Sequence, residues 1–283
     1  MSTTINLNAY AKINLTLDVL KRLESGYHEI ETVYHQIGLH DTIILKELEE
    51  KHVIIKTNAD IPKESNLAYK SAMLLKKRFK VQKGAEITIK KQIPIASGLS
   101  GGSTDAASVL IGLNKLWNLQ LKSDALIEMA QQIGMDVPFS LLGGTALGTG
   151  RGETLQKIKT ELKIPLLIII PGFWISTAEA YKSLKEEELG KSRRAGKMAE
   201  AIGKEDLKKV AGCIGNDFEP WATRKYPEIR KIKQNLLEAG ALNAALSGSG
   251  PTVFGIFENS ETAMKAHKLL KGKYPFVQVT RSR

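Results

Sequence analysis

Glycines and hydroxyl side chains are concentrated in the stretch PIASGLSGGSTDAASVL, residues 94–110, where Gly98, Gly101 and Gly102 fall within five residues. The hydroxyl residues of the same stretch are Ser97, Ser100, Ser103 and Thr104. Glycines let the backbone curl around a tetrahedral anion, and the first turn of a helix offers unpaired N–H groups and partial positive charge. The stretch therefore predicts a phosphate-binding loop, and a tight strand-to-helix turn without a ligand is the alternative interpretation.

The residues on either side of the loop predict a strand before it and a helix after it. EITIKKQIPI is typical of a strand, and apolar residues recur at helical spacing from Ala106 to Trp117. Ser103 or Thr104 is the expected N-cap of that helix. The loop has neither the GK[ST] ending of a P-loop nor the G-x-G-x-x-G pattern of a dinucleotide-binding fold.

Apolar and polar residues alternate from Ile5 to Val19, which predicts one long strand with a single buried face. Lys12 and Asn14 then point the same way, roughly 7 Å apart along the strand. Two interpretations are open. Their side chains lie on a solvent-exposed outer face of the sheet, or they face a reacting centre.

Two further positions could take part in chemistry. The turn at Gly26 and the strand-like residues after it predict a hairpin, with Tyr27 and His28 at its rim. Such residues pack as amphipathic side chains, or they stack on a planar base.

Asp136 lies two residues before Pro138, which is an N-cap arrangement. Capping alone would explain it, but a carboxylate held at a helix start is also placed rigidly enough to accept a proton.

The second half of the chain alternates strands and helices. PLLIIIPG (165–172) predicts a buried strand, and WISTAEAYKSL predicts a helix capped by Ser176 or Thr177. Residues 185–209 are rich in charge, and we expect them to be mobile. LSGSGPTVFGI predicts a glycine turn and a strand, followed by the helix ETAMKAHKLLKG and the strand FVQVT. This order predicts an α+β sandwich.

Composition narrows the class of protein. The 283 residues suffice for two domains or one large one, and the formal net charge of +11 favours anionic partners. The lysines are spread along the chain, which favours phosphate-bearing metabolites over nucleic acid. Cys213 is the only cysteine, so one chain cannot form a disulfide. No apolar run approaches a membrane span and no signal segment is recognisable, so we expect a cytoplasmic protein that binds no membrane. The residues do not determine an oligomeric state.

Three stretches taken in order, AYAKINLTLDV, PIASGLSGGSTDAA and LSGSGPTVFGIF, resemble the GHMP kinases, which are small-molecule kinases with a glycine-serine loop. The motifs SGYHEIETV, SNLAYKSA, GMDVPF and PGFWISTAEAY extend the resemblance from residue 9 to about 257. It implies a two-domain α+β fold. A ribosomal-protein-like βαβ domain that binds ATP would cover residues 1–160, and a ferredoxin-like α+β sandwich would cover residues 161–283.

The resemblance also implies roles for matching residues. Lys12 and Asp136 would form the catalytic pair, with Asp136 as general base. Asn66 and Leu67 would border the adenine. The remaining ATP contacts would come from Pro94, Ile95, Ala96, Ser97, Gly98, Leu99, Ser100, Gly101, Gly102, Ser103 and Thr104. The substrate would contact Asn14, Tyr27, His28, Thr177 and Tyr181. Mg²⁺ would bridge the ATP phosphates with help from a loop hydroxyl, for which we favour Ser103. Ser100 stands where many GHMP loops carry glycine.

Three functions compete at this point. Within the family, the sequence looks similar to kinases of the non-mevalonate isoprenoid route, which phosphorylate the tertiary 2-hydroxyl of a methylerythritol unit linked to cytidine diphosphate. The second candidate is a homoserine or mevalonate type of GHMP kinase, for which the base-stacking residues Tyr27, His28 and Tyr181 would be unnecessary. The third is a basic nucleic-acid-binding protein, which requires aromatic residues among its basic ones. Aromatic residues make up only 6% of the chain.

Overall fold

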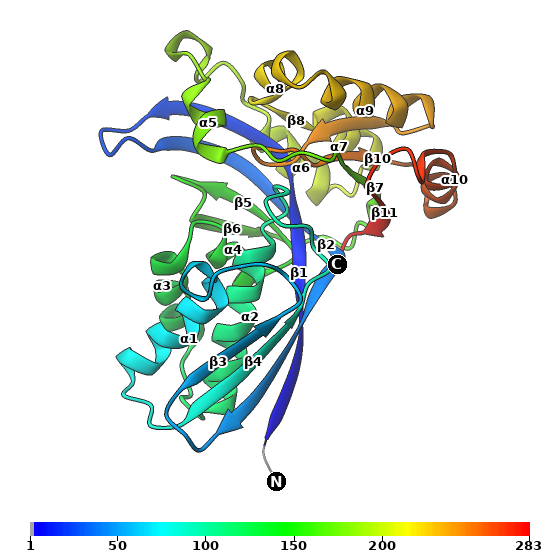
Figure 1. Cartoon of the computed structure of the whole chain (residues 1–283). Helices are drawn as coiled ribbons and strands as arrows, with labels where there is room; N and C mark the ends of the chain where they lie inside the picture. Colours follow the sequence, from blue (N-terminus) through cyan, green and yellow to red (C-terminus); the bar gives the residue numbers. More distant parts are fainter. Residues whose placement is uncertain (1–2) are drawn as a thin grey trace. The chain divides into compact units, whose positions relative to one another are not determined.

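The computed structural model describes residues 3–283, which form two compact units (Figure 1). Of the described residues, unit 1 contains 3–11, Leu39–Ile95 and Ser100–Gly143. Unit 2 contains Lys12–Gly38, Ala96–Leu99 and Gly144–Arg283. The long strands β1 (Thr4–Arg22) and β2 (His28–Leu48) have residues in both units, and so does the predicted phosphate-binding loop. The expected domain boundary at residue 160 stays a prediction.

Unit 1 packs helices against strands, as Figure 1 shows for α1 and α2 beside β3 and β4. Its remaining elements are β3 (Val53–Thr57), η1 (Lys63–Ser65), α1 (Leu67–Arg78), β4 (Gly84–Lys90), α2 (Gly101–Leu116), α3 (Ser123–Ile133) and α4 (Val137–Leu142). β3 and β4 pair in parallel on either side of α1, which makes a βαβ unit, and β4 pairs antiparallel with β2. Leu75, Ile87 and Leu110 lie in one apolar core because the helices turn their apolar stripes toward the strands.

Unit 2 contains short strands that pair with β1 and β2. These are β5 (Thr145–Thr149), β6 (Thr154–Ile158) and β8 (Gly215–Asn216). β8 runs parallel to β1, whereas β5 pairs antiparallel with β2 and with β6. Figure 1 shows the turn between β1 and β2, which the Gly26 signal predicted as a hairpin turn.

A second sheet in unit 2 has the strand order β11-β7-β10-β9, and every neighbouring pair is antiparallel. The strands are β7 (Pro165–Ile170), β9 (Asn243–Leu246), β10 (Val253–Ile256) and β11 (Phe276–Arg281). β7 is buried along its whole length, as its continuous apolar run predicts. Ile229, Leu236 and Ala263 pack on this sheet from α9 (Pro227–Glu238) and α10 (Ser260–Leu270). The ferredoxin-like α+β sandwich is therefore confirmed.

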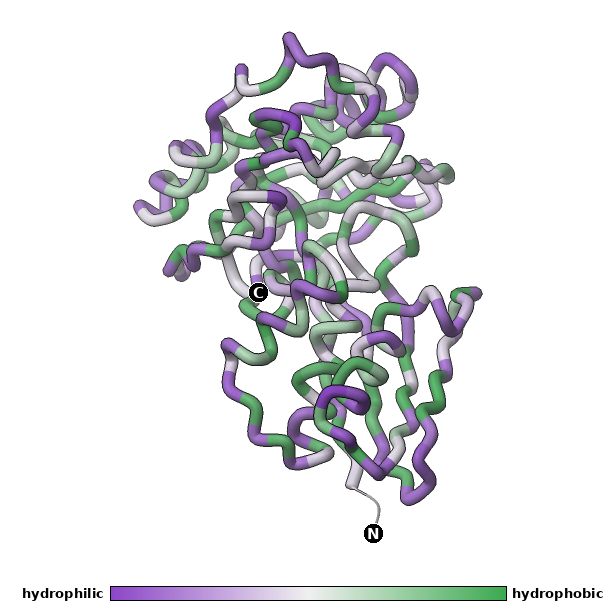
Figure 2. The backbone as a smooth tube through the Cα atoms, turned by 90° about the vertical axis from the view of Figure 1, so that its left-hand side faces the viewer, coloured by the Kyte–Doolittle hydropathy of each residue, from purple (hydrophilic) through white to green (hydrophobic). Residues whose placement is uncertain are grey.

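The remaining helices of unit 2 are α5 (Thr177–Lys182), η2 (Glu186–Glu188), α6 (Ala195–Gly203), α7 (Leu207–Cys213) and α8 (Glu219–Lys225). Residues 185–209, which the sequence predicted to be mobile, contain η2, α6 and the first residues of α7. Met198 and Ile202 of α6 are fully buried, because Ala195, Met198 and Ile202 recur at i, i+3 and i+7 and form one apolar stripe on the helix. Residues 3–283 contain no helix both long and apolar enough to cross a membrane, and Figure 2 shows hydrophilic residues interspersed along the tube.

Candidate active site

Lys12 and Asn14 lie side by side in unit 2, both almost completely buried. The Lys12 Nζ donates to Asn14 Oδ1 at 2.7 Å and to the carbonyl oxygen of Gly98 at 3.3 Å. It also lies 5.6 Å from the centre of the Tyr34 ring. Asn14 Nδ2 donates to Thr32 Oγ1 at 2.8 Å, so the amide orientation is held from the neighbouring strand. The lysine and the amide therefore form a fixed polar pair.

The prediction of a single buried face on β1 is wrong beyond Ala11. Both faces are buried from Ala11 to Val19, although the even positions remain polar. Hydrogen bonds from distant segments satisfy these polar side chains, which makes their burial possible. The interpretation of Lys12 and Asn14 as part of a wet outer face is thereby excluded.

Residues 96–99 of the glycine loop belong to unit 2, where they lie against a second glycine turn, residues 246–252. Thr252 Oγ1 donates to the Ser97 carbonyl oxygen at 2.5 Å, and Ser247 Oγ donates to that of Gly98 at 3.3 Å. Gly98 has φ +82°, and a Cβ there would lie 2.6 Å from the Ser247 carbonyl oxygen. Only glycine fits, because a side chain would meet strained backbone and a fixed carbonyl.

The flanking loop positions differ in exposure. Leu99 is buried, whereas Ile95 is exposed and Pro94 is half-buried. Ala96 adopts a positive φ of 52°. The sequence analysis did not assign a role to the 246–252 turn, although its alternating glycines and serines were visible.

The second half of the loop begins α2 in unit 1, and the predicted N-cap of this helix was three or four residues late. The helix begins at Gly101, and Ser100 occupies the N-cap with a left-handed φ of 57° and no side-chain cap. Thr104 does not cap the helix, because its hydroxyl donates to the Tyr10 carbonyl oxygen at 2.8 Å. Gly101 and Gly102 therefore provide the first backbone N–H groups of the helix, which have no intrahelical partner. Ser103 lies half-buried in the same first turn.

Asp136 occupies the N-cap position of α4, also in unit 1. Its side chain makes no capping hydrogen bond, and its backbone angles (φ −88°, ψ −8°) are already helical. The carboxylate instead accepts a hydrogen bond from the hydroxyl of Ser100. Capping alone therefore does not account for this aspartate. Its predicted pairing with Lys12, which lies in the other unit, stays a prediction.

Asn66 and Leu67 lie at the start of α1 in unit 1. Asn66 Oδ1 caps the helix by accepting from the backbone N–H of Ala68 at 3.0 Å. A Cβ on Gly102 would lie 3.8 Å from a methyl group of Leu67, so this leucine borders the first turn of α2. The predicted adenine and phosphate contacts within unit 1 are therefore neighbours.

A buried ionic cluster that the sequence analysis missed also lies in unit 1. Lys91 Nζ contacts Asp41 Oδ2 at 2.5 Å and Asp105 Oδ2 at 2.8 Å. A Cβ on Gly101 would lie 3.1 Å from the same Nζ, so the cluster borders the start of α2. Burial, together with the nearby Asp41 carboxylate, raises the pKa of Asp105 to about 8, against the opposing charge of Lys91. The available signal was the pair Lys90 and Lys91 before the glycines and Asp105 after them.

The aromatic side chains to which the resemblance assigns substrate contacts lie in unit 2, and their assignment to the substrate stays a prediction. The rings of His28 and Tyr181 stack with centroids 4.9 Å apart, and Arg151 lies 5.2 Å from the centre of the Tyr27 ring. Thr177 Oγ1 lies 2.9 Å from Ser249 Oγ. Burial, with a smaller contribution from the charge of Arg22, lowers the pKa of His28. The sequence analysis missed Arg151, which follows directly after a glycine.

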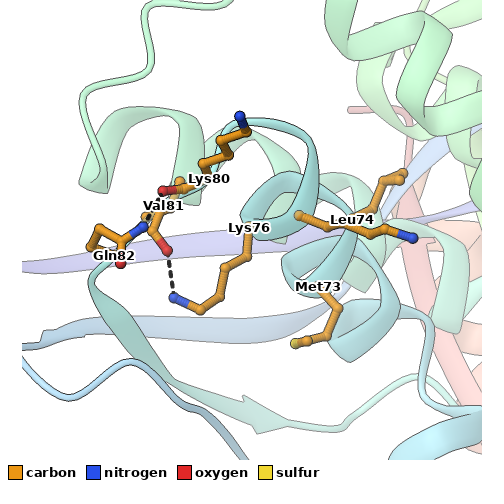
Figure 3. A pocket seen from close by; sticks show the side chains of 7 residues that line it. Met73, Leu74, Lys76, Lys80, Val81 and Gln82 are labelled. Carbon is orange, nitrogen blue, oxygen red and sulfur yellow. Dashed lines mark hydrogen bonds between the residues drawn. The ribbon is translucent and has the colours of Figure 1, made fainter.

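A shallow surface hollow lies elsewhere, at the C-terminal end of α1 (Figure 3). Lys76 bends across it and donates to the Val81 and Lys83 carbonyl oxygens, each at 2.7 Å. The Lys76 amine therefore stabilises the turn that follows α1. None of the residues predicted to bind ATP or substrate lines this hollow.

Comparison with known proteins assigns the class of protein. The family model for the N-terminal domain of GHMP kinases matches residues 66–144, and the model for the C-terminal part of GHMP kinases matches residues 198–274. A homoserine kinase structure from Cytophaga hutchinsonii has a TM-score of 0.75 at 19% identity and covers 99% of this chain and 94% of its own, which shows the shared fold. The two-domain GHMP-kinase fold is confirmed.

Sequence comparison narrows the family further. The 4-diphosphocytidyl-2-C-methyl-D-erythritol kinase of Pelotomaculum thermopropionicum is 44% identical over 97% of this chain and 96% of its own length. A crystal structure of 4-(cytidine 5'-diphospho)-2C-methyl-D-erythritol kinase has a TM-score of 0.85 at 29% identity and covers 98% of this chain and 99% of its own. The chain belongs to the 4-diphosphocytidyl-2-C-methyl-D-erythritol kinase family. It is therefore a small-molecule kinase.

Proposed function

We propose that the chain transfers the γ-phosphate of ATP to the 2-hydroxyl of 4-diphosphocytidyl-2-C-methyl-D-erythritol, a step of the non-mevalonate route to isoprenoid precursors. The observation that carries the proposal is the stacked pair of His28 and Tyr181, because a planar base needs aromatic neighbours and an aliphatic alcohol does not. Arg151 beside Tyr27 adds a positive charge suited to the diphosphate. The proposal places the reaction in the cytoplasm.

The loop 94–104 holds the ATP phosphates in this proposal. Its left-handed residues and the fixed Gly98 shape the backbone in advance, and the start of α2 contributes N–H donors and positive potential. Asn66 and Leu67 border the adenine. Phosphoryl transfer depends mostly on alignment and charge neutralisation, which a rigid loop of this kind supplies.

Asp136 acts as the general base that accepts the proton of the substrate 2-hydroxyl. Support comes from its carboxylate, which is not used for capping and is oriented by the Ser100 hydroxyl. Lys12, held by Asn14 and the Gly98 carbonyl oxygen, neutralises charge on the phosphoryl oxygens during transfer. Asn14 faces the reacting centre from the same strand face, and Thr177 contacts the substrate.

Mg²⁺ would be held mainly by the ATP phosphates, with the Ser103 hydroxyl as a protein ligand. Among residues 3–283 no three His, Cys, Asp or Glu side chains are grouped to hold a metal ion. This fits an ion that prefers substrate phosphates and water to a protein cage. When bound, it would neutralise charge on the β- and γ-phosphates.

The test is a phosphate-transfer assay that offers ATP with each of three acceptors in parallel. These are 4-diphosphocytidyl-2-C-methyl-D-erythritol, mevalonate and homoserine. We expect phosphorylation of the cytidine compound alone. The Tyr181→Ala variant should raise KM for that compound without changing KM for ATP. Preferential phosphorylation of mevalonate or homoserine would overturn the proposal.

A further inference from the structure

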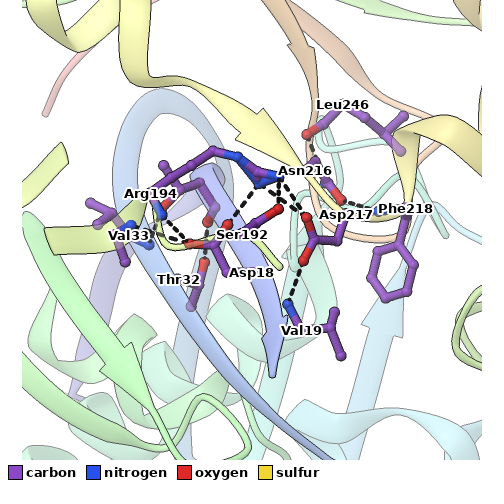
Figure 4. Close-up of polar contacts among 12 residues, drawn as sticks. Asp18, Val19, Thr32, Val33, Ser192, Arg194, Asn216, Asp217, Phe218 and Leu246 are labelled. Atoms are coloured by element: carbon purple, nitrogen blue, oxygen red, sulfur yellow. Dashed lines mark hydrogen bonds and ion pairs between the residues drawn. The ribbon is translucent and has the colours of Figure 1, made fainter. Parts of the chain in front are cut away.

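Arg194 connects two carboxylates from separate segments of unit 2 (Figure 4). Its Nη1 lies 2.6 Å from Asp18 Oδ1, and its Nη2 lies 2.5 Å from Asp217 Oδ1. The Asp18 side chain is fully buried, whereas that of Arg194 is 27% exposed. A cluster of this kind costs desolvation, so a role beyond stability is worth seeking.

Asp18 also holds the backbone at the start of α6. Its Oδ2 accepts from the backbone N–H of Arg194 at 2.6 Å and from that of Ala195 at 3.2 Å. Asp18 lies on the same face of β1 as Lys12 and Asn14, because side chains alternate along a strand. The cluster therefore fixes where α6 begins relative to the strand that carries the predicted catalytic lysine.

Asp217 continues the connection on the other side. Its Oδ2 accepts from the Val19 N–H at 2.8 Å, and its own N–H donates to the Leu17 carbonyl oxygen at 3.0 Å. The next residue, Phe218, is buried and meets the ring of Tyr181 edge-on at a centroid distance of 4.9 Å. Tyr181 in turn stacks on His28. A continuous series of contacts thus runs from Arg194 to the predicted base-stacking pair.

Asn216 extends the same segment to the second glycine turn. Its Nδ2 donates to the Leu246 carbonyl oxygen at 2.9 Å and to that of Gly248 at 2.7 Å. Its Oδ1 accepts from the N–H of Phe218 at 2.9 Å. Residues 216–218 therefore touch the glycine turn, the Arg194 cluster and Tyr181 at once.

We propose that Arg194 is a positioning residue for the nucleoside end of the substrate, acting through Asp217 and Phe218 to hold Tyr181 against His28. This inference rests on the proposed function and adds a residue to which the sequence assigned no role. A lysine could not replace it, since only the planar guanidinium bonds to both carboxylates and to Ser192 Oγ at 2.8 Å together.

The experiment compares Arg194→Lys and Arg194→Met with the control Arg193→Met. Arg193 is adjacent in sequence but pairs with Glu31 at 3.4 Å on the surface, with its side chain 62% exposed. For Arg194→Lys we expect KM for the cytidine compound to rise roughly 2- to 30-fold, with kcat and KM for ATP within about twofold of wild type. Arg193→Met should leave all three constants unchanged.

A second readout needs no substrate. The His28 imidazole is titrated by NMR, with its signal assigned from a His28→Gln variant. Loosening of Tyr181 exposes His28 to water, so we expect its titration midpoint to move up toward the ordinary value of 6.5 in the Arg194 variants. If Arg194→Met fails to fold, the double variant Asp18→Asn/Arg194→Met removes the arginine together with the fully buried Asp18 carboxylate and is measured in the same way.

The two hypotheses can fail separately. A wild-type protein that does not phosphorylate the cytidine compound contradicts the proposed function, and the His28 titration then still tests the contact series. A folded Arg194→Lys protein with reduced stability but unchanged KM and unchanged His28 titration would show a purely structural arginine. That result would overturn the positioning role.

Discussion

The two units bury titratable groups of opposite kinds. Unit 1 encloses the carboxyl of Asp105 beside Asp41 and Lys91, and burial raises the pKa of Asp105 to about 8. Unit 2 encloses the imidazole of His35, whose nitrogens lie 2.8 Å from Thr145 Oγ1 and 2.8 Å from Ser282 Oγ. Burial, helped by the charge of Lys163, lowers the pKa of His35 to about 4.

One physical cause explains both shifts. A low-dielectric interior disfavours the charged form, so the buried acid retains its proton and the buried base excludes one. In unit 1 two carboxylates and one lysine would carry a net negative charge, which one bound proton removes. The comparison predicts that unit 1 loses stability toward high pH and unit 2 loses it toward low pH. The predicted catalytic pair is divided in the same way, with Asp136 in unit 1 and Lys12 in unit 2.

The largest effect on activity should come from replacing Asp136, the member of the predicted catalytic pair that lies in unit 1. Asp136→Asn keeps the size of the side chain but removes the proton acceptor, so we expect kcat to fall about 100- to 10,000-fold with ATP affinity retained. Steady-state kinetics and nucleotide binding measure the two properties. Asp124→Asn, an exposed change in the first turn of α3, is the matched control. If Asp136→Asn turned over substrate at near the wild-type rate, Asp136 would not be the general base.

The next largest effect tests the ionic cluster of unit 1. Lys91→Met leaves Asp41 and Asp105 without a buried cation, and we expect the free energy of unfolding to fall by about 3–5 kcal/mol. Urea denaturation at pH 7 measures this. Lys83→Met breaks a surface pair with Glu47 that water screens, and its cost should be much smaller than that of Lys91→Met. Equal costs for the two variants would contradict the distinction between buried and exposed pairs.

Acid tests the histidine of unit 2. The folded-state pKa of His35, about 4, lies below its ordinary value of 6.5, so the unfolded chain binds more protons in between. Stability is therefore complete above pH 6.5 and decreases as pH falls toward 4, by about 3 kcal/mol for this group. His35→Gln can keep both hydrogen-bond partners but cannot titrate. Its stability should vary less over that pH range, and an unchanged slope would count against the assignment.

Alkaline pH tests the carboxyl of unit 1. The folded-state pKa of Asp105, about 8, lies above its ordinary value of 3.8, so its contribution is present at low pH and is lost as pH rises through 8. Asp105→Asn should remove this dependence and gain about 3 kcal/mol relative to wild type between pH 6 and pH 9. Denaturation midpoints across that range report the difference. If the difference in stability between Asp105→Asn and wild type stayed constant over this pH range, Asp105 would not titrate there.

Much of the fold follows from patterns that are local in sequence. The buried run of β7, the Gly26 turn, the Ser176 cap of α5 and the strand–loop–helix order around the glycines were all predictable. Each depends on residues within a few positions of one another, whose backbone preferences act without the rest of the chain. The boundary of α2 was missed because the left-handed Ser100, rather than a capping side chain, ends the loop.

The sequence by itself determined the glycine loop, the alternating strand that carries Lys12 and Asn14, and the motifs that indicate a GHMP kinase. Only the tertiary structure decided that both faces of β1 are buried beyond Ala11 and that Arg194 joins Asp18 and Asp217. Periodicity reports the side of an element on which apolar residues lie, but a buried polar residue depends on partners supplied from distant parts of the chain. Those partners become neighbours only when the chain folds.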